Sequence, residues 1–373
     1  MKNKKIIHLI TTIERGGAEK QLLTLVQEQV RAGICVTVIP LKGRLELQDE
    51  FEKAGAVVAI NYANKKLLVQ MFRLRKFFNH LNDEMAVIHA HLPRAEIMAF
   101  LTSVDVPYLV SRHNTEAFFP AAPRILSNGL SKLILLNAKA CVAISPAVDE
   151  FLRKGSELNA STKISIIPYG FGPRKDLDQN KLEEIRKEFN KPGSIVIGTV
   201  GRLTKQKDYP TLLKAFCEVV RINPNAYLLI IGEGELKEEL IQYSRELRID
   251  QNIVWIGKTE FVNEYLSVMS VFVLSSIYEG FGLVLLEAMQ MHVPIVASRN
   301  SAIPDVLGAE HPGLVTTGDV QEFANKILKF CIPEEKKVIK EFQDRRLMLF
   351  TPEIMSKRIN DLYEKILFTK SKN

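Results

Sequence analysis

The stretch Ser275–Met289, SSIYEGFGLVLLEAM, decides the fold. It follows an apolar strand, Val271–Leu274, and leads through the turn Glu279-Gly280-Phe281-Gly282 into a run apolar enough for a buried helix. A strand, a tight turn and a helix N terminus therefore follow one another. The first amides of a helix have no acceptor within it, and the helix dipole adds partial positive charge, so this turn can bind a phosphate.

Two carboxylates bracket the turn: Glu279 within it and Glu287 one to two turns down the helix. At a rise of about 1.5 Å per residue, Glu287 lies roughly 7 to 9 Å beyond the phosphate. In a nucleoside diphosphate the ribose lies at about that remove from the distal phosphate, so Glu287 can bind both ribose hydroxyls. The alternative is a solvent-facing glutamate. The apolar neighbours of Glu287 argue against it, because a carboxylate among them needs a partner.

Apolar strands alternate with helices along most of the chain, which predicts parallel sheets covered on both faces. The alternation breaks at Tyr169–Lys181, a charged stretch with glycine and proline that reads as a linker, and restarts at Ile195. With 373 residues, we expect two doubly wound α/β domains, 1–170 and 171–351, facing each other across a cleft. Ligands bind at the carboxyl ends of such strands.

The composition says less than these motifs about which function the protein has. The net charge of +7 fits an anionic partner such as a nucleotide sugar, an anionic lipid or a nucleic acid, without choosing among them. No apolar run approaches the roughly 20 residues that span a bilayer, and the start, MKNKKIIHLITT, reads as a first strand. The four cysteines form no metal-binding spacing; we expect buried free thiols in a reducing cytosol.

Two loops at strand ends suit a diphosphate. Gly201-Arg202-Leu203 with Lys207 places a guanidinium and an ammonium after strand Ile195–Val200, unless the loop is merely solvated and basic. Gly16-Gly17, before a helix at Ala18, lets backbone approach a ligand, although a plain tight turn fits nearly as well. Neither the Gly16-Gly17 loop nor Gly232-Glu233-Gly234 carries the third glycine of a dinucleotide fingerprint, which speaks against a nicotinamide or flavin site.

Histidines end two strands of the first domain. His89 and His91 share a strand face and could suggest a metal pair, but no third ligand is evident, so one of them is expected to be structural. His113 is expected to face the cleft and bond a sugar hydroxyl or carbonyl. Asp176-Leu177-Asp178 has the form of a metal-binding DxD. Because a helix follows, Asp178 reads as its N-cap, and we predict no metal ion.

The segment Lys65–Leu81, KKLLVQMFRLRKFFNHL, is basic and amphipathic with no acidic residue. Two interpretations stay open. It can lie on an anionic membrane surface, or it can be an ordinary domain helix that buries one apolar stripe and solvates its charges. The stripe is formed by Leu67, Met71, Leu74, Phe78 and Leu81.

Together these motifs resemble glycosyltransferase family 4, retaining enzymes with the GT-B fold. The resemblance covers most of the chain, and its most specific part is Glu279 to Glu287 with Phe-Gly inside. The sequence departs from the family at Ile303-Pro304-Asp305, where glycine commonly precedes the proline and glutamate follows it. The other stretches that carry the resemblance are Gly16-Gly17-Ala18-Glu19, Ser111-Arg112-His113-Asn114, Ile167-Pro168-Tyr169-Gly170, Gly201-Arg202-Leu203 with Lys207, and Ile231-Gly232-Glu233-Gly234.

The resemblance implies a retaining hexosyltransferase of polysaccharide synthesis that works in the cytoplasm, with a UDP-sugar donor held mainly by the second domain. The acceptor, a glycan or lipid-linked hydroxyl, would be held by the first. No cofactor, metal or nucleic acid is expected. The last helix, about 352–373, would pack back on the first domain. With no carboxylate placed as a nucleophile, the acceptor would attack from the front face with retention.

The resemblance also assigns roles to residues. Arg202 and Lys207 would bind the diphosphate and stabilise charge on the leaving group. Glu287 would bind the ribose, and Glu279, with the amides of Phe281 and Gly282, the sugar hydroxyls. Gly16 would approach the diphosphate and His113 the sugar, which makes Glu279, His113, Arg202 and Lys207 the catalytic set. The remaining expected substrate contacts are Gly17, Gly201, Leu283, and Ile256 and Lys258 beside the base.

Three other classes are weighed against this one. A nucleotide-sugar epimerase of the same two-domain shape would need cleft carboxylates that the first domain does not evidently supply. A non-catalytic nucleotide-sugar binding protein would follow if the Asp305 departure disabled the site. The missing fingerprint disfavours a dinucleotide oxidoreductase.

Overall fold

The computed structural model describes residues 4–81, 85–103, 105–119, 122–158, 162–173, 176–189 and 193–370. The chain forms two compact units: unit 1 contains Met1–Gly172 and Phe350–Asn373, and unit 2 contains Pro173–Leu349. Arg174 and Lys175 of the expected linker, and 371–373 of the expected last helix, lie outside the described residues.

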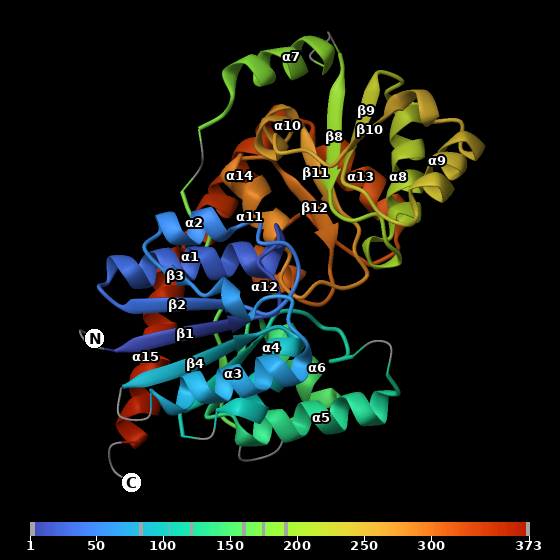
Figure 1. The fold of residues 1–373 in the computed structure, drawn as a ribbon. Coiled ribbons are helices and arrows are strands. Elements are labelled where there is room, and N and C mark those ends of the chain that lie inside the picture. The colour runs from blue at the N-terminus through green and yellow to red at the C-terminus, as the bar shows by residue number, and fades with distance from the viewer. Residues whose placement is uncertain are drawn as a thin grey trace. The chain divides into compact units, whose positions relative to one another are not determined.

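Unit 1 is built on a parallel sheet in the order β3-β2-β1-β4-β5-β6-β7 (Figure 1). Because the order runs outward in both directions from β1, helices cover both faces: the crossover helices α3, α4 and α5 lie on one face, and the crossover helix α1 and the last helix α15 lie on the other. The strands are β1 (Lys5–Ile10), β2 (Cys35–Pro40), β3 (Val57–Val58), β4 (Ala86–His91), β5 (Tyr108–Arg112), β6 (Ala140–Ala143) and β7 (Ile164–Ile166). The helices are α1 (Gly17–Arg31), α2 (Gln48–Lys53), α3 (Leu67–Asn79), α4 (Pro93–Thr102), α5 (Arg124–Asn137), α6 (Pro146–Lys154) and α15 (Pro352–Lys370).

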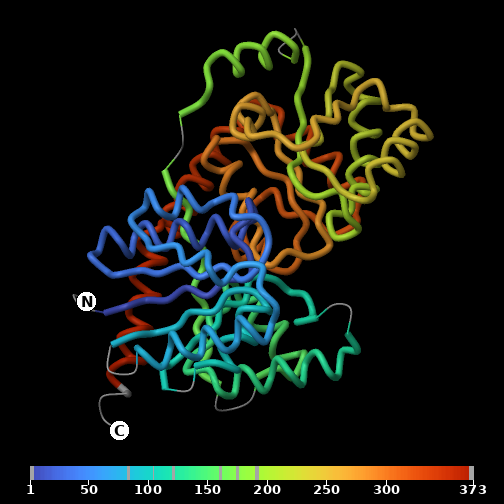
Figure 2. Tube along the Cα trace, viewed as in Figure 1, coloured from blue at the N-terminus to red at the C-terminus, as the bar shows by residue number. Residues whose placement is uncertain are grey.

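The last helix belongs to unit 1 although it comes from the far end of the sequence. It packs against α1 and β4, and Figure 2 shows its red trace running beside the blue start of the chain. Tyr363 is fully buried there. Gly170 leaves room for the entry of this helix, since a Cβ at that position would lie 2.6 Å from the Cα of Pro352.

Unit 2 repeats the pattern with a parallel sheet in the order β10-β9-β8-β11-β12-β13. Its strands are β8 (Ile195–Val200), β9 (Ala226–Ile231), β10 (Ile253–Gly257), β11 (Val271–Leu274), β12 (Ile295–Ser298) and β13 (Leu314–Val315). Its helices are α7 (Gln179–Phe189), α8 (Tyr209–Ile222), α9 (Lys237–Glu246), α10 (Val262–Val268), α11 (Leu283–Gln290), α12 (Ile303–Leu307), α13 (Val320–Phe330) and α14 (Pro333–Leu347). The predicted fold class, doubly wound α/β with parallel sheets, is confirmed.

Several local predictions change. Strand β3 covers only Val57–Val58, because the chain then turns into a short 3-10 helix at Ile60–Tyr62. Tyr169, expected in the linker, is buried in unit 1. All four cysteines are free, but only Cys141 is buried and Cys35 is exposed, so the expectation of buried thiols holds for one position alone. Asp178 caps α7 as predicted: its Oδ1 accepts from the Lys181 amide at 3.0 Å.

The segment Lys65–Leu81 forms α3 from Leu67 to Asn79. Leu74, Phe78 and Leu81 of the predicted stripe are buried, but Leu67 is exposed, and Gln70 takes the inward place that an apolar side chain was expected to fill. The Gln70 amide donates to the carbonyls of Leu41 and Tyr62, which satisfies it in the core. Among the described residues, no helix is long and apolar enough to cross a bilayer.

Candidate active site

The carboxyl ends of four neighbouring strands of unit 2 carry the residues that the sequence singled out. In sheet order, Lys258 follows β10, Gly232 follows β9, Gly201–Lys207 follow β8 and Ser275–Gly282 follow β11. Adjacent parallel strands end at one edge, so these loops meet. Gly201 and Gly232 pack so closely that a Cβ on Gly232 would lie 2.0 Å from the Gly201 carbonyl oxygen.

The turn before α11 takes the form that its sequence requires. Gly282 has φ of 86° and ψ of 56°, a left-handed conformation that glycine adopts without strain. Among the described residues no side chain caps α11, and although the Leu285 amide donates to the Gly282 carbonyl at 2.9 Å, the start of the helix can still offer backbone amides to a ligand. Phe281 is buried beneath the turn, and Leu283 is half-buried at the first helical position.

Lys207 and Glu279, both predicted site residues, contact each other. Lys207 Nζ donates to Glu279 Oε1 at 2.5 Å, and Ser276 Oγ donates to the same oxygen at 2.7 Å. Ser275 Oγ in turn donates to the Lys207 carbonyl at 2.7 Å, which ties the two loops together. The carboxylate thus neutralises the ammonium that we expect to meet a diphosphate. The sequence did not predict this ion pair.

Tyr209 supports the same loop from below. Its hydroxyl donates to the Gly201 carbonyl at 3.1 Å. Burial, and then the neighbouring Glu279 carboxylate, raise the pKa of Tyr209, so its proton stays in place for that hydrogen bond.

The other predicted residues of unit 2 differ in exposure. Arg202 is exposed and, in the part of the chain that the structure describes, forms no ion pair. Glu287 is half-buried on α11 rather than enclosed, and Ile256 is half-buried near the end of β10, beside the exposed Lys258. Of the predicted set, the structure therefore brings Lys207 and Glu279 into direct contact, whereas Arg202 forms no ion pair within the described residues.

In unit 1, Gly16 is the N-cap of α1 and Gly17 its first residue. The space beside Gly16 is taken by the buried carboxylate of Glu19: a Cβ on Gly16 would lie 2.2 Å from Glu19 Oε2. Glu19 Oε1 accepts from the Thr12 hydroxyl at 2.6 Å. Close packing within this loop is thus one reason for glycine at position 16.

His113 is half-buried after β5, and hydrogen bonds use both of its ring nitrogens. Nδ1 bonds the Tyr169 hydroxyl at 2.6 Å, and Nε2 lies 3.2 Å from His91 Nδ1. Burial, and then the Arg112 guanidinium, lower the pKa of His113 to about 4. A sugar can bond this ring only by displacing Tyr169 or His91, so the role of His113 toward the sugar stays a prediction.

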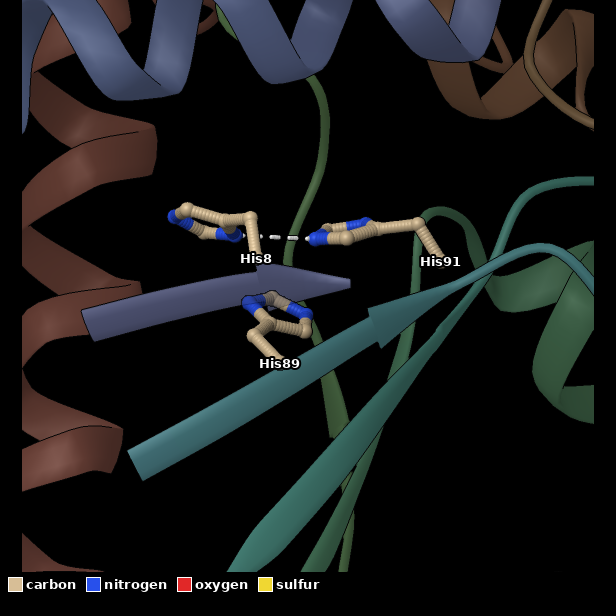
Figure 3. A group of neighbouring side chains, drawn as sticks. All are labelled: His8, His89 and His91. Carbon is tan, nitrogen blue, oxygen red and sulfur yellow. Dashed lines mark hydrogen bonds between the residues drawn. The ribbon is translucent and has the colours of Figure 1, made fainter. Parts of the chain in front are cut away.

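The third histidine that the sequence did not reveal is His8 of β1 (Figure 3). His8, His89 and His91 project from neighbouring strands toward α1, and one nitrogen from each lies within 4.8 Å of the others. Each ring nitrogen of the three already bonds a protein group, so a cation here would have to break those bonds. The signal for His8 was a histidine inside the apolar strand KIIHLI.

A buried ion network beside His113 was also missed. Arg112 Nε lies 2.9 Å from Glu96 Oε2 and Nη1 lies 3.2 Å from Glu157 Oε2, and all three side chains are buried. The guanidinium also stands 4.6 Å from the Phe118 ring centroid. The positive charge of Arg112 is therefore already paired with carboxylates of unit 1.

Two family models match consecutive parts of the chain: "Glycosyltransferase Family 4" over residues 15–174 and "Glycosyl transferases group 1" over residues 180–344. With the two doubly wound sheets, they define the class of protein as a GT-B glycosyltransferase. The chain belongs to glycosyltransferase family 4.

Relatives agree with this assignment. The chain is 26% identical over 391 residues to the capsular polysaccharide biosynthesis glycosyltransferase CapM of Staphylococcus aureus, covering 98% of both proteins. It is 24% identical over 294 residues to the N-acetyl-alpha-D-glucosaminyl L-malate synthase of Bacillus anthracis, covering 77% of this chain and 75% of that protein. Neither the epimerase nor the dinucleotide alternative is favoured by such relatives.

Among solved structures, Anabaena HepE in complex with UDP-glucose matches with a TM-score of 0.79 at 19% identity, covering 97% of this chain and 99% of that one. A sucrose-phosphate synthase from Thermosynechococcus elongatus matches with a TM-score of 0.75 at 20% identity, covering 98% of this chain and 100% of that one. At these identities the likeness concerns the fold.

Proposed function

We propose that the protein is a retaining hexosyltransferase that moves a sugar from a UDP-sugar to a hydroxyl of a glycan or lipid-linked acceptor in envelope or capsule polysaccharide synthesis. The observation that carries the proposal is the Lys207–Glu279 pair at the uncapped start of α11. A cation, an acid and the first amides of a helix lie at one strand-end turn, which is what an anionic diphosphate and a hydroxylated sugar require.

The expected chemistry follows from charge. When the glycosidic bond breaks, negative charge grows on the departing diphosphate. Lys207, Arg202 and the first amides of α11 would bind that charge more strongly in the transition state than before it. Glu279 would hold sugar hydroxyls, and Glu287, one turn along α11, the ribose. Gly16, Gly17 and His113 are the groups of unit 1 proposed to meet the substrates.

The UDP part of the proposal is supported by the HepE complex with UDP-glucose, and the acceptor part by the named activity of CapM. The test is a panel of labelled UDP- and GDP-sugars incubated with the protein and a membrane extract. Transfer from a UDP-hexose with the anomeric configuration preserved in the product is the expected result. Inversion, or hydrolysis without transfer, would contradict it.

Variants of the loop after β8 test where the diphosphate binds. Lys207→Ala and Arg202→Ala should each lower UDP affinity and transfer about ten- to a hundredfold, because a charge-assisted contact is worth about 1.5 to 3 kcal/mol. Lys205→Ala is the matched control, since Lys205 lies exposed in the same loop. If all three variants bind UDP like the parent protein, the assignment of this loop is wrong.

We also propose that unit 1 meets an anionic membrane through α3. Leu68 and Phe72 are each 72% exposed on this helix, beside the exposed Lys65, Lys66 and Arg73. Apolar side chains that remain exposed on a helix without acidic residues suit a bilayer surface. This contact would place the protein at the cytoplasmic face of the membrane.

Co-sedimentation with vesicles that contain phosphatidylglycerol tests the membrane contact. The double variant Leu68→Ser, Phe72→Ser should lose most binding at low salt, whereas Val338→Ser, exposed on α14 of unit 2, should not. Equal binding by both variants would favour the ordinary domain helix.

A further inference from the structure

The histidines of unit 1 form a connected set of hydrogen bonds with a single consistent order of protons. His8, His89, His91 and His113 contact one another or shared partners, and no carboxylate bonds their rings in the described residues. Burial lowers the pKa of His8 to about 4 and of His89 and His91 well below the usual value, so all four rings are neutral at pH 7. A neutral imidazole donates once and accepts once.

The first branch starts at Gln29 of α1. Its Oε1 can only accept, so His8 donates from Nε2 across 2.8 Å and accepts at Nδ1. His91 Nε2 donates to that Nδ1 across 3.1 Å, and His113 Nε2 donates to His91 Nδ1 across 3.2 Å. His113 Nδ1 then accepts from the Tyr169 hydroxyl.

The second branch starts at the other end of the same amide. Gln29 Nε2 donates to the Tyr363 hydroxyl across 3.5 Å, and that hydroxyl donates to His89 Nδ1 across 2.6 Å. His89 Nε2 donates to Ser111 Oγ across 2.7 Å. Since Ser111 accepts here, its own proton has to point to another group.

The hydroxyl proton of Ser111 can point into a cavity. Ser111 and Tyr169, the ends of the two branches, line one cavity within unit 1 together with Gln21. The space open to the centre of a water molecule is about 20 Å³, and one water needs roughly 10 to 15 Å³. Gln21 Oε1 is a buried acceptor with no hydrogen-bond partner among the described residues.

We propose that one ordered water occupies this cavity and closes the two branches into a ring. The water accepts from Ser111 and donates to the Tyr169 oxygen and to Gln21 Oε1, three bonds that are usual for a buried water. Every hydrogen bond then runs in one direction, from Gln29 Nε2 through Tyr363, His89, Ser111, the water, Tyr169, His113, His91 and His8 back to Gln29 Oε1.

Gln29 fixes the tautomers of the four histidines in this ring, because its Oε1 can only accept and its Nε2 can only donate. The water pairs the Ser111 proton with Gln21 Oε1 and donates to the Tyr169 oxygen, so it positions the hydroxyl that bonds His113 Nδ1, although it does not reach a substrate. The inference does not depend on the donor, which is expected to bind unit 2, so UDP binding can fail while the ring stands.

Two measurements on the full chain test the ring. In nitrogen-15 spectra of labelled histidine at pH 7, assigned with single His→Gln variants, all four rings should be neutral and share one tautomer. A crystal structure at high resolution should show an oxygen atom bonded to Gln21, Ser111 and Tyr169. Mixed tautomers, an imidazolium, or a dry cavity would each overturn the proposal.

A variant pair separates positioning from general packing. Ser111→Ala removes the donor to the water, and we expect crystals of this variant to lack the oxygen atom bonded to Gln21 and Tyr169, while the histidines keep the tautomer that Gln29 imposes. Ser127→Ala removes a buried serine that accepts from the Phe119 amide at 2.8 Å outside the ring, and it should leave the water in place. If Ser111→Ala fails to fold, Gln21→Leu, which removes the acceptor of the water, should also empty the cavity. A water that keeps full occupancy in a folded variant of either kind would contradict the ring.

Discussion

At the scale of single residues, the contact between Lys207 and Glu279 sets what a ligand must do. The ammonium is held at 2.5 Å from a buried carboxylate, so an incoming diphosphate competes with Glu279 for it. Glu279 keeps the Ser276 hydroxyl when Lys207 turns to the diphosphate, which spares it a fully unpaired buried charge. The pair can therefore open when an anion arrives.

The ribose role of Glu287 is the next test at this scale. Glu287→Ala should weaken UDP binding about tenfold or more, because two hydroxyls lose their acceptor, and should leave pyrophosphate binding nearly unchanged. Isothermal titration with both ligands measures this difference. Glu239→Ala, at an exposed site on α9, is the control. Equal losses of affinity for UDP and pyrophosphate would show that Glu287 does not bind the ribose.

The buried histidines predict acid sensitivity. Their pKa values are lowered in the folded state, so below about pH 6.5 the unfolded chain takes up protons that the folded chain refuses. Stability is thus fully present above pH 6.5 and is lost toward pH 4, by about 1.4 kcal/mol per pH unit for each histidine. Urea unfolding at pH 7, 6 and 5 measures the slope.

Glu96 changes the stability with pH in the opposite direction, but it is a single group against four histidines. Burial raises its pKa to about 7 against the attraction of Arg112, so its contribution is present below about pH 4.5 and is lost as the pH rises to 7. The histidines dominate on the acid side. His8→Gln should lower the slope by about one proton. A free energy of unfolding that stays constant from pH 7 to 5 would contradict the neutral cluster.

Sequence reasoning picked several residues of these sites but missed the side chains that contact them. Lys207, Glu279 and His113 could be picked because each follows an apolar strand. The partners Glu96, Glu157, Tyr363 and His8 could not, because a side-chain contact depends on strand order and packing, and sequence spacing does not encode either. Tyr363 bonds His89 across 274 positions of the chain. No local sequence pattern can predict a contact between residues so far apart in the chain.

At the scale of elements, glycines decide how closely the loops of unit 2 approach. Gly232 has φ of 138°, and Gly234 stands where a Cβ would lie 2.4 Å from the Leu203 carbonyl oxygen. Only a residue without a side chain fits between β8 and β9 there. The sequence showed these glycines as a weak fingerprint, while the structure shows them as spacers that hold the Gly201 loop in place.

Gly232→Ala tests that spacing. The new methyl group would meet the Gly201 oxygen at 2.0 Å in a strained conformation, so we expect a loss of about 3 kcal/mol or more in the free energy of unfolding. UDP affinity should fall with it. Gly318→Ala, with φ of 83° and open space, should cost only about 1 kcal/mol. Urea titrations of both variants would contradict the steric account if their losses were equal.

Helix periodicity predicted elements better than it predicted their faces. The sequence placed the start of α11 directly after Gly282, as observed, because a run of apolar residues after a strand and a turn leaves little choice. In α3 it misassigned Leu67, since Gln70 is inward and fully hydrogen-bonded. A buried polar side chain with backbone partners leaves no signal in an apolar pattern.

At the scale of the whole molecule, the chain closes unit 1 with its last segment. Unit 2 is one continuous stretch, whereas unit 1 needs residues from both ends of the sequence. Helix α15 buries Met355, Ile359, Tyr363 and Ile366, and through Tyr363 it reaches the histidines of β4. Unit 1 is therefore incomplete until α15 packs.

This asymmetry predicts different behaviour for the two units when they are made separately. Residues 173–349 should fold alone, with a cooperative urea transition and dispersed amide resonances, and should bind UDP, because the proposed nucleotide residues Arg202, Lys207 and Glu287 all belong to unit 2. Residues 1–172 should not fold stably, since removal of α15 leaves the apolar faces of α1 and β4 and the bond from His89 uncovered. Adding a peptide of residues 350–370 should restore structure to 1–172, and the same peptide with Tyr363→Asp should not. A stable fragment 1–172 that ignores the peptide would show that α15 is an accessory. A folded 173–349 that fails to bind UDP would move the nucleotide site elsewhere.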